Sequence, residues 1–346
     1  MNMASYSIIP PGAGGVRDYA SILSGPLHAP LLELAEATET SGLSGDLLLV
    51  HFSGYGFQAR GVPAWLVRRL RQMRPRFNQV GVVFHELFAS GPPWSSAFWL
   101  SGAQKRIARE LVALADFWVT NREESARWLS RYAGPVPHKV LPVFSNVGEL
   151  DTVDGRRQDT LVVFGSAEVR SKVYAWANGQ VFDYAKRSQL QIHDIGPTIG
   201  DVSLQARLSE EGVAVRGKLS ADEVSAALAA ARLGAVAYPV EFVAKSGVFA
   251  AYCAHGVCPI LLSSSYATHD GLVANEHFLA GFNALAGDSR ARVVGSNARA
   301  WYEPHRVSAA QAAFQALARG SVGGKYPVPG RVHAGSEQGA GSGVTV

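Results

Sequence analysis

Short β-rich runs alternate with helical stretches along most of this chain, and this alternation is what most constrains its fold. Runs at 47–52, 80–84 and 116–120 are typical of buried strands. Between the first two, residues 62–73 place Pro63 at a helix start and apolar residues at helical spacing. Strands connected by helices form parallel sheets covered on both faces. The sequence therefore predicts an α/β fold with doubly wound sheets.

A break separates two such alternating regions. Residues 132–159 are rich in Pro, Gly and polar side chains, and the alternation restarts at 160–165 with "TLVVFG". Further strands are predicted at 233–240 and 258–263. A chain of 346 residues suits two domains. The predicted units are an N-terminal Rossmann-like domain (1–145), a C-terminal Rossmann-like domain (155–305), a terminal helix (306–322) and a disordered tail (330–346).

Composition excludes several classes of protein. Hydrophobic residues make up 47% of the chain and charged residues 17%, which is typical of a globular protein rather than a disordered one. A net charge of +4 is too small to indicate nucleic-acid binding, although it is compatible with anionic substrates or an anionic membrane surface. Only Cys253 and Cys258 are present, which favours a reducing, cytoplasmic compartment. We expect neither a signal peptide nor a transmembrane span.

A glycine-rich turn, "PPGAGG" (10–15), leads from the first predicted strand into a helix. Such a turn lets the backbone approach an anion closely, and the helix start offers free N–H groups. The dinucleotide fingerprint G-x-G-x-x-G fails, because Arg17 occupies the position of its last glycine. A Walker loop fails as well, because "AKSG" (244–247) lacks its upstream glycine. An ordinary tight turn and an anion-binding turn both remain possible here.

Polar residues follow several predicted strands, where ligands bind in open α/β sheets. His85 and Glu86 end one strand, and Glu86 is a candidate general base if the reaction inverts configuration. Arg170 and Lys172 follow another strand as candidate phosphate-binding cations. The segment from Glu241 through Lys245, Ser246 and Gly247 to Val248 combines an acid, a cation and a helix start. Tyr55 and Trp94 lie on loops that suit an acceptor, with turn formation and core packing as the alternative roles.

In this order, the glycine turn, "VVFHELFASGPPW" (82–94), "VVFGSAEVRSKVY" (162–174) and "VEFVAKSGVFAAYCAHGVCPIL" (240–261) resemble GT-B glycosyltransferases, particularly family-4-like bacterial enzymes. The resemblance runs over most of residues 5–320. It implies two domains facing across a cleft, and retaining transfer from a nucleotide diphosphate sugar to a glycan or lipid-linked acceptor without metal or cofactor. It implies these roles: donor binding by Gly14, Gly15, Gly165, Arg170, Lys172, Glu241, Ser246, Gly247 and Val248; diphosphate stabilisation by Arg170 and Lys245; ordering of the sugar and acceptor side by His85; and acceptor contact by Tyr55 and Trp94. Glu86 stays a catalytic candidate only as the base of an inverting reaction.

The sequence departs from the family pattern in one place. That pattern has two glutamates eight positions apart, whereas Glu241 lies two positions early and Ala251 occupies the place of the second. Two alternatives therefore stay open: a nucleotide-sugar epimerase of the same architecture, and a non-catalytic module that scaffolds glycan assembly. A dehydrogenase is disfavoured by the failed fingerprint.

A basic surface is a further candidate feature of the N-terminal half. Its residues are Arg68, Arg69, Arg71, Arg74, Arg76, Lys105, Arg106 and Arg109. Such a surface suits peripheral contact with anionic phospholipid, and a solvated helix face is the alternative explanation.

Overall fold

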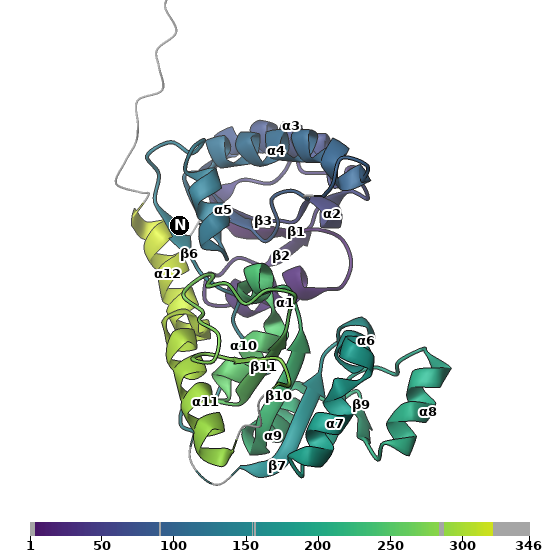
Figure 1. Cartoon of the computed structure of the whole chain (residues 1–346). Helices are drawn as coiled ribbons and strands as arrows, with labels where there is room; N and C mark the ends of the chain where they lie inside the picture. The colour runs from purple at the N-terminus through teal and green to yellow at the C-terminus, as the bar shows by residue number, and fades with distance from the viewer. Residues whose placement is uncertain (1–3, 90, 154, 156, 284–286, 321–346) are drawn as a thin grey trace, which may run out of the picture.

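Two six-stranded parallel sheets form the framework of the protein (Figure 1). The computed structural model describes residues 4–89, 91–153, 155, 157–283 and 287–320. The N-terminal sheet has the order β2-β1-β3-β4-β5-β6. Its strands are β1 (Ser5–Ile9), β2 (Leu31–Glu33), β3 (Gly45–Phe52), β4 (Phe77–Phe84), β5 (Phe117–Thr120) and β6 (His138–Val140). The accompanying helices are α1 (Gly15–Ser24), α2 (Gly54–Phe57), α3 (Ala64–Met73), α4 (Ser96–Leu114), α5 (Glu123–Leu129) and the 3-10 helix η1 (Arg74–Arg76).

The C-terminal sheet has the order β12-β11-β10-β7-β8-β9. Its strands are β7 (Gln158–Phe164), β8 (Gln191–Ile195), β9 (Ala214–Gly217), β10 (Ala231–Ala237), β11 (Cys258–Leu262) and β12 (Leu279–Ala280). The helices are α6 (Ala167–Ala175), α7 (Gln180–Arg187), α8 (Val202–Glu210), α9 (Ala221–Ala230), α10 (Gly247–Ala254), α11 (Asp288–Tyr302) and α12 (Val307–Gly320), with 3-10 helices η2 (Trp176–Asn178), η3 (Val240–Lys245) and η4 (Glu303–His305).

Strand β3 shows why both faces of the sheets are apolar. Successive side chains of a strand point to opposite faces. Leu48 and Val50 therefore pack in the cluster that includes α3 and α4, and Leu47 and Leu49 pack in the cluster that includes α1. The second cluster continues into the C-terminal domain, so a single apolar core connects the two halves of the molecule.

In each sheet, successive strands are added first on one side of the opening strand and then on the other. These two points of reversal indicate where a ligand would bind. In the N-terminal sheet the chain goes from β1 to β2 on one side and then to β3 on the other. In the C-terminal sheet, β7 is followed by β8 on one side and by β10 on the other. Ligands of open parallel sheets bind beyond the carboxyl ends of strands at such points. The loops after β1, β3, β7 and β10 are therefore the expected binding loops.

Most predicted elements are present, with differences in the short strands. The sequence did not predict β2, β6, β8 or β12. The predicted strand 233–240 is β10, which ends at Ala237, and the 3-10 helix η3 begins at Val240. The predicted terminal helix corresponds to α12, while 321–322 and the predicted tail lie outside the described residues.

The terminal helix α12 leaves the C-terminal domain and packs along the N-terminal one (Figure 1). The Gln311 side chain donates to the backbone oxygen of Ile22 at 3.4 Å, and Gln315 donates to that of Pro26 at 3.2 Å. Together with the linker after β6, this helix forms a second connection between the domains.

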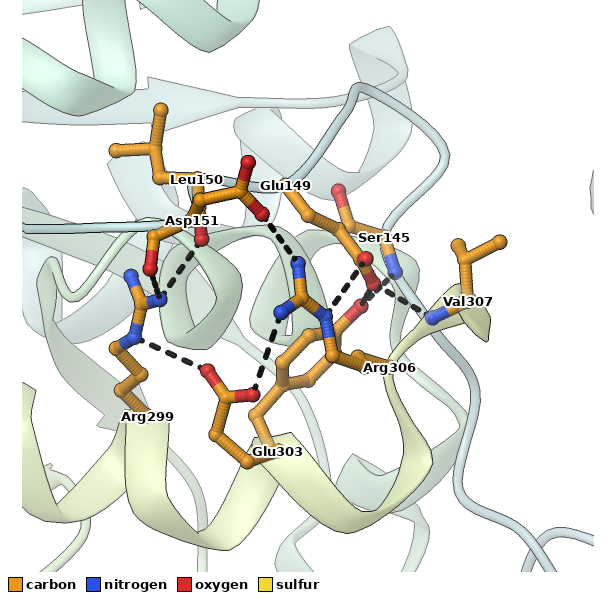
Figure 2. A network of polar contacts seen from close by, with 9 residues as sticks. Ser145, Glu149, Leu150, Asp151, Arg299, Glu303, Arg306 and Val307 are labelled. Carbon is orange, nitrogen blue, oxygen red and sulfur yellow. Dashed lines mark hydrogen bonds and ion pairs between the residues drawn. The ribbon is translucent and has the colours of Figure 1, made fainter. Parts of the chain in front are cut away.

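A polar network fastens the linker to α11 and α12 (Figure 2). Glu149 accepts hydrogen bonds from the Tyr302 hydroxyl, from Arg306 Nε at 3.3 Å and from the backbone N–H of Val307 at 2.8 Å. Arg299 donates to the backbone oxygens of Leu150 and Asp151 in the same linker. The carboxylate of Glu149 is therefore the centre of the contact between the linker and the terminal helices.

Replacing Glu149 by alanine is expected to lower the free energy of unfolding by about 3 kcal/mol, because it removes a largely buried carboxylate that accepts from the Tyr302 hydroxyl and the Val307 backbone N–H. Urea unfolding followed by tryptophan fluorescence measures this. Glu149→Gln keeps acceptor oxygen and is expected to lose less. Glu168→Ala removes an exposed acid and serves as the matched control. Equal losses in Glu149→Ala and Glu168→Ala would contradict the importance of the network.

Most of the predicted basic surface is engaged within the protein. Arg74 pairs with Asp116, and Arg71 and Arg106 both pair with Glu110. Arg76 donates to the backbone oxygen of Thr40. These contacts give the guanidinium groups partners other than lipid phosphates, so phospholipid contact remains a prediction. Among the described residues, no helix combines the length and apolar character that crossing a bilayer requires.

Candidate functional site

A hollow of about 270 Å³ lies between the two domains, at the carboxyl ends of the strands. It is where the topology places a binding site. The N-terminal domain contributes Gly15, Val16, Asp18, Tyr19, Ser53, His85, Glu86 and Asn121; the linker contributes Val143, Phe144 and Asn146; the C-terminal domain contributes Tyr238, Lys245 and Gly247. We call this space the interdomain hollow.

The glycine turn forms one edge of the interdomain hollow. Gly12 and Gly14 have positive φ values of 95° and 148°, which side-chain-bearing residues rarely adopt. Gly15 begins α1, and a Cβ added there would meet no atom within 4 Å. Arg17 Nε donates to the backbone oxygen of Gly12 at 2.9 Å, and the same side chain pairs with Glu33. Arg17 thus braces the turn, and the open start of α1 faces the hollow.

His85 and two residues behind it form a hydrogen-bonded row beneath the hollow. His85 Nε2 lies 3.2 Å from His51 Nδ1, and His51 Nε2 lies 3.1 Å from the hydroxyl of Ser7. The ring edge of Tyr19 also contacts His85, with 5.0 Å between ring centres. Burial, with a smaller contribution from the charge of Lys245, lowers the pKa of His85 to about 3. His85 is therefore a neutral imidazole at physiological pH, able to exchange hydrogen bonds with a sugar hydroxyl.

Three buried histidines make stability depend on pH. Burial lowers the pKa of His85 and of His305 to about 3, and that of His51 well below its usual range. In the unfolded chain their pKa is about 6.5. Between these values the unfolded chain binds more protons than the folded one. The contribution of these groups to the free energy of unfolding is therefore fully present above pH 6.5. As the pH falls below that value, the free energy of unfolding decreases by up to about 1.4 kcal/mol per pH unit for each group.

Urea unfolding at several pH values between 7.5 and 5 should show this slope. His305→Phe is expected to flatten it, because one of the titrating groups is removed. The exposed His28 offers a matched control, and His28→Gln should leave the slope unchanged. A wild-type slope retained in His305→Phe would show that His305 titrates normally in the fold.

Glu86 and Lys245 face each other across the domain boundary. Lys245 Nζ lies 4.0 Å from Glu86 Oε1, and the hydroxyl of Ser53 donates to Glu86 Oε2 at 3.0 Å. The Lys245 side chain is only 20% exposed, and burial lowers its pKa, with Glu86 opposing that shift. The sequence identified both residues separately, and the structure brings them together in one site.

The start of α10 lies beside Lys245. Ser246 is the N-cap, and its hydroxyl accepts from the backbone N–H of Phe249 at 3.2 Å. Gly247 begins the helix and lines the interdomain hollow. The N-termini of α1 and α10, one from each domain, therefore border the same space and supply partial positive charge there. Ala251, at the place of the missing glutamate, is fully buried in the core.

The structure does not support the role predicted for Arg170. It was expected to bind the donor diphosphate, but its side chain is 1% exposed and its guanidinium is fully engaged. Nε donates to the backbone oxygen of Gly165 at 3.0 Å, and the other two nitrogens contact the Asp194 carboxylate and the backbone oxygen of Pro197. Arg170 therefore fastens the loop after β7 to the end of β8, and the charge available to a ligand comes from Lys245.

Other predicted donor residues lie outside the interdomain hollow. Lys172 is exposed on α6 and pairs with Glu168 at 2.7 Å. Glu241 is half-buried in η3 and does not line the hollow. Gly165 has φ 128°, and an added Cβ would come within 3.0 Å of Val248. The absence of a side chain at Gly165 thus permits close packing of α10, which is a structural role for Gly165 and Val248.

The two predicted acceptor-side residues have different surroundings. Tyr55 lies on α2, accepts a hydrogen bond from Gln104 at 3.1 Å and lines a second hollow of about 640 Å³. We call this second space the acceptor hollow, after the role predicted for Tyr55, and it shares His85, Glu86 and Lys245 with the interdomain hollow. Trp94 is 86% exposed and lines neither space.

Sequence reasoning missed several residues of the interdomain hollow. Ser53, Asn121 and Tyr238 each come directly after a strand, the same signal that identified His85. Asn146 belongs to the linker, where no pattern pointed to it. The residues that the structure describes include no group of three or more His, Cys, Asp or Glu side chains placed to hold a metal ion.

The fold is that of known glycosyltransferases. No protein-family model matches the sequence, and no curated protein matches it either. An α-glucosyltransferase solved with UDP and a 13-mer DNA shares 11% identity, with a TM-score of 0.53 over 94% of this chain and 100% of that one. AviGT4, a glycosyltransferase involved in avilamycin A biosynthesis, shares 11% identity, with a TM-score of 0.51 over 92% and 98% of the two chains.

TarM is also similar, at 11% identity and a TM-score of 0.51 over 79% of this chain, which spans only about half (54%) of TarM. At these identities the likeness concerns architecture alone. The chain therefore has the two-domain α/β fold of GT-B glycosyltransferases, and the predicted fold class is confirmed.

Proposed function

We propose that this protein transfers a sugar from a nucleotide diphosphate sugar to a glycan or lipid-linked acceptor. One observation carries the proposal: Lys245 and the start of α10 face the start of α1, His85 and Glu86 across the interdomain hollow. A diphosphate needs positive charge and N–H donors, whereas a sugar needs groups that exchange hydrogen bonds with hydroxyls. Both kinds of group line this one space.

In the proposed reaction, Lys245 and the two helix N-termini stabilise the charge that develops on the departing diphosphate. Such preorganised donors supply the electrostatic stabilisation that a metal provides in other enzymes, so we propose a metal-independent reaction. Neutral His85 and the carboxylate of Glu86 would hold sugar hydroxyls, with Ser53 fixing the orientation of Glu86. A retaining reaction, in which the departing diphosphate accepts the acceptor proton, follows from the resemblance to family-4-like enzymes.

Nucleotide binding is the first test. Calorimetric titration with UDP, GDP, ADP and dTDP in the presence of EDTA is expected to show binding of one nucleotide. UDP is the first choice, because two structures of this fold, the α-glucosyltransferase and a point variant of S. aureus TarM, were solved with it. Lys245→Met should weaken binding. Lys186→Met, which removes an exposed cation on α7 that pairs with Glu211, should not.

Two results would overturn the proposal. If none of the four nucleotides binds to folded protein, the donor site is absent, and the non-catalytic scaffold becomes the better account. If a nucleotide sugar is epimerised without any acceptor, the protein is an epimerase of the same architecture.

A further inference from the structure

The acceptor hollow has more positive charge than its own acids neutralise. It contains two pairs of opposite charge, Lys245 with Glu86 and Arg122 with Glu124. Two more arginines, Arg127 and Arg131, line it without an ion pair to any residue that the structure describes. His85 adds no charge, because burial keeps its pKa near 3. The space therefore has an excess of two positive charges.

The spacing of residues on α5 brings these groups to one side. Glu124, Arg127, Trp128 and Arg131 follow the positions i, i+3, i+4 and i+7 of a helical face. The turn that follows α5 continues this face, since the backbone N–H of Arg131 donates to the oxygen of Trp128 at 3.3 Å. All four residues line the acceptor hollow. Arg127 on α5 and Arg131 in the turn after it therefore present both unpaired guanidinium groups along one face.

Arg122 adds a buried donor without a partner. It is 8% exposed, its guanidinium stacks 4.3 Å from the ring centre of Phe242, and one nitrogen donates to Glu124 at 2.5 Å. Its Nε is buried and has no hydrogen-bond partner among the described residues. Because Nε is enclosed by protein, a ligand in the hollow would contact the parts of Arg122 that line it rather than Nε.

Part of the wall of the acceptor hollow is apolar. Phe88 and Trp128 line it, with their rings edge to face and 5.0 Å between ring centres. A sugar ring has an apolar face that packs against such a wall, and specificity then comes from a few placed polar groups. An apolar wall beside unpaired guanidiniums suits a ring that bears an anionic group.

We propose that the acceptor bound in this hollow is a sugar or polyol bearing a phosphate or carboxylate group, held by Arg122, Arg127 and Arg131. The inference rests on the proposed glycosyltransferase function, because that function makes the space beside Glu86 and Lys245 the acceptor site. Guanidinium groups bind both kinds of oxyanion, in bidentate geometry where access allows. The anion would orient the ring so that a hydroxyl reaches the donor sugar.

Titration calorimetry on protein saturated with its nucleotide tests this, with glucose, glucose 6-phosphate and glucuronate as probes and inorganic phosphate as the anion without a ring. We expect one of the anionic sugars to bind at least about tenfold more tightly than glucose. Comparison of the two anionic sugars tells phosphate from carboxylate. In Arg127→Gln/Arg131→Gln this preference should fall about fivefold or more. The control Arg187→Gln/Arg216→Gln removes the same charge from exposed sites outside both hollows and should keep it.

The inference is overturned if nucleotide binds but anionic sugars bind no better than glucose, or if both double variants lose the preference equally. If no nucleotide binds, the proposed function fails instead. Anion binding to the free protein that is lost only in Arg127→Gln/Arg131→Gln would then still establish the anion site.

Discussion

Lys245→Met is expected to lower kcat/KM for sugar transfer by a factor of about 10²–10³, while the folded structure is retained. Among the described residues that line the interdomain hollow, Lys245 is the only lysine or arginine, and its side chain is mostly enclosed. In such surroundings a charge acts through a lower dielectric constant than in water, so its removal raises the barrier substantially. Methionine keeps the apolar stem and removes only the charge.

The matched control for this experiment is Lys186→Met, which removes a cation whose side chain is 65% exposed. Steady-state kinetics on both variants, with melting temperatures measured in parallel, separate a loss of chemistry from a loss of fold. Equal kcat/KM in wild type and Lys245→Met would contradict the assigned role. A defect confined to the melting temperature would give Lys245 a structural role only.

The transfer activity is also expected to depend on the protonation of Lys245 at alkaline pH. Burial lowers the pKa of Lys245, although Glu86 opposes the shift. Only the protonated amine stabilises the departing diphosphate, so activity is expected to fall as the pH rises through this lowered pKa. In Lys245→Arg the fall should shift to higher pH, because guanidinium stays protonated.

The contrast between Lys245 and Arg170 shows what sequence could predict about the site. Both are cations that follow a strand, and the sequence treated them alike. Arg170 turns inward because Asp194 lies on the neighbouring strand β8, which was not predicted. Burial raises the pKa of Asp194, and the Tyr174 hydroxyl and Arg170 together hold its oxygens. Whether a cation at the end of a strand has a structural role or is available to a ligand thus depends on partners from another strand.

The fold was more predictable than the site, because hydrophobic periodicity is a local property. Long runs such as β3, β4 and β7 pack on both faces and so contain continuous apolar residues. The missed β8 interrupts its apolar residues with His193 and Asp194, and β2 and β6 span only three residues each. The packing of α12 on the N-terminal domain depends on contacts almost 290 residues apart in sequence, such as Gln311 with Ile22, which no local pattern reports.

Replacing Glu86 by glutamine is expected to lower kcat/KM by roughly 10- to 100-fold with little change in nucleotide affinity. In the proposed reaction Glu86 accepts a hydrogen bond from a sugar hydroxyl. Glutamine retains an acceptor oxygen there but loses the charge, and hydrogen bonds to charged groups are worth about 1.5–3 kcal/mol. The acidic side of the pH–rate profile should persist in this variant, because the departing diphosphate accepts the proton. Glu210→Gln removes an exposed acid on α8 as the control.

A different result would assign Glu86 another role. A loss of about 10²–10⁴ in kcat, together with disappearance of the acidic limb, is the behaviour of a missing general base. NMR of the product would then show inverted anomeric configuration, and the retaining mechanism would have to be abandoned. The geometry favours the first outcome. Oε2 of Glu86 accepts a hydrogen bond from the Ser53 hydroxyl, and Oε1 faces Lys245 Nζ, so both carboxylate oxygens are held in place by neighbouring groups.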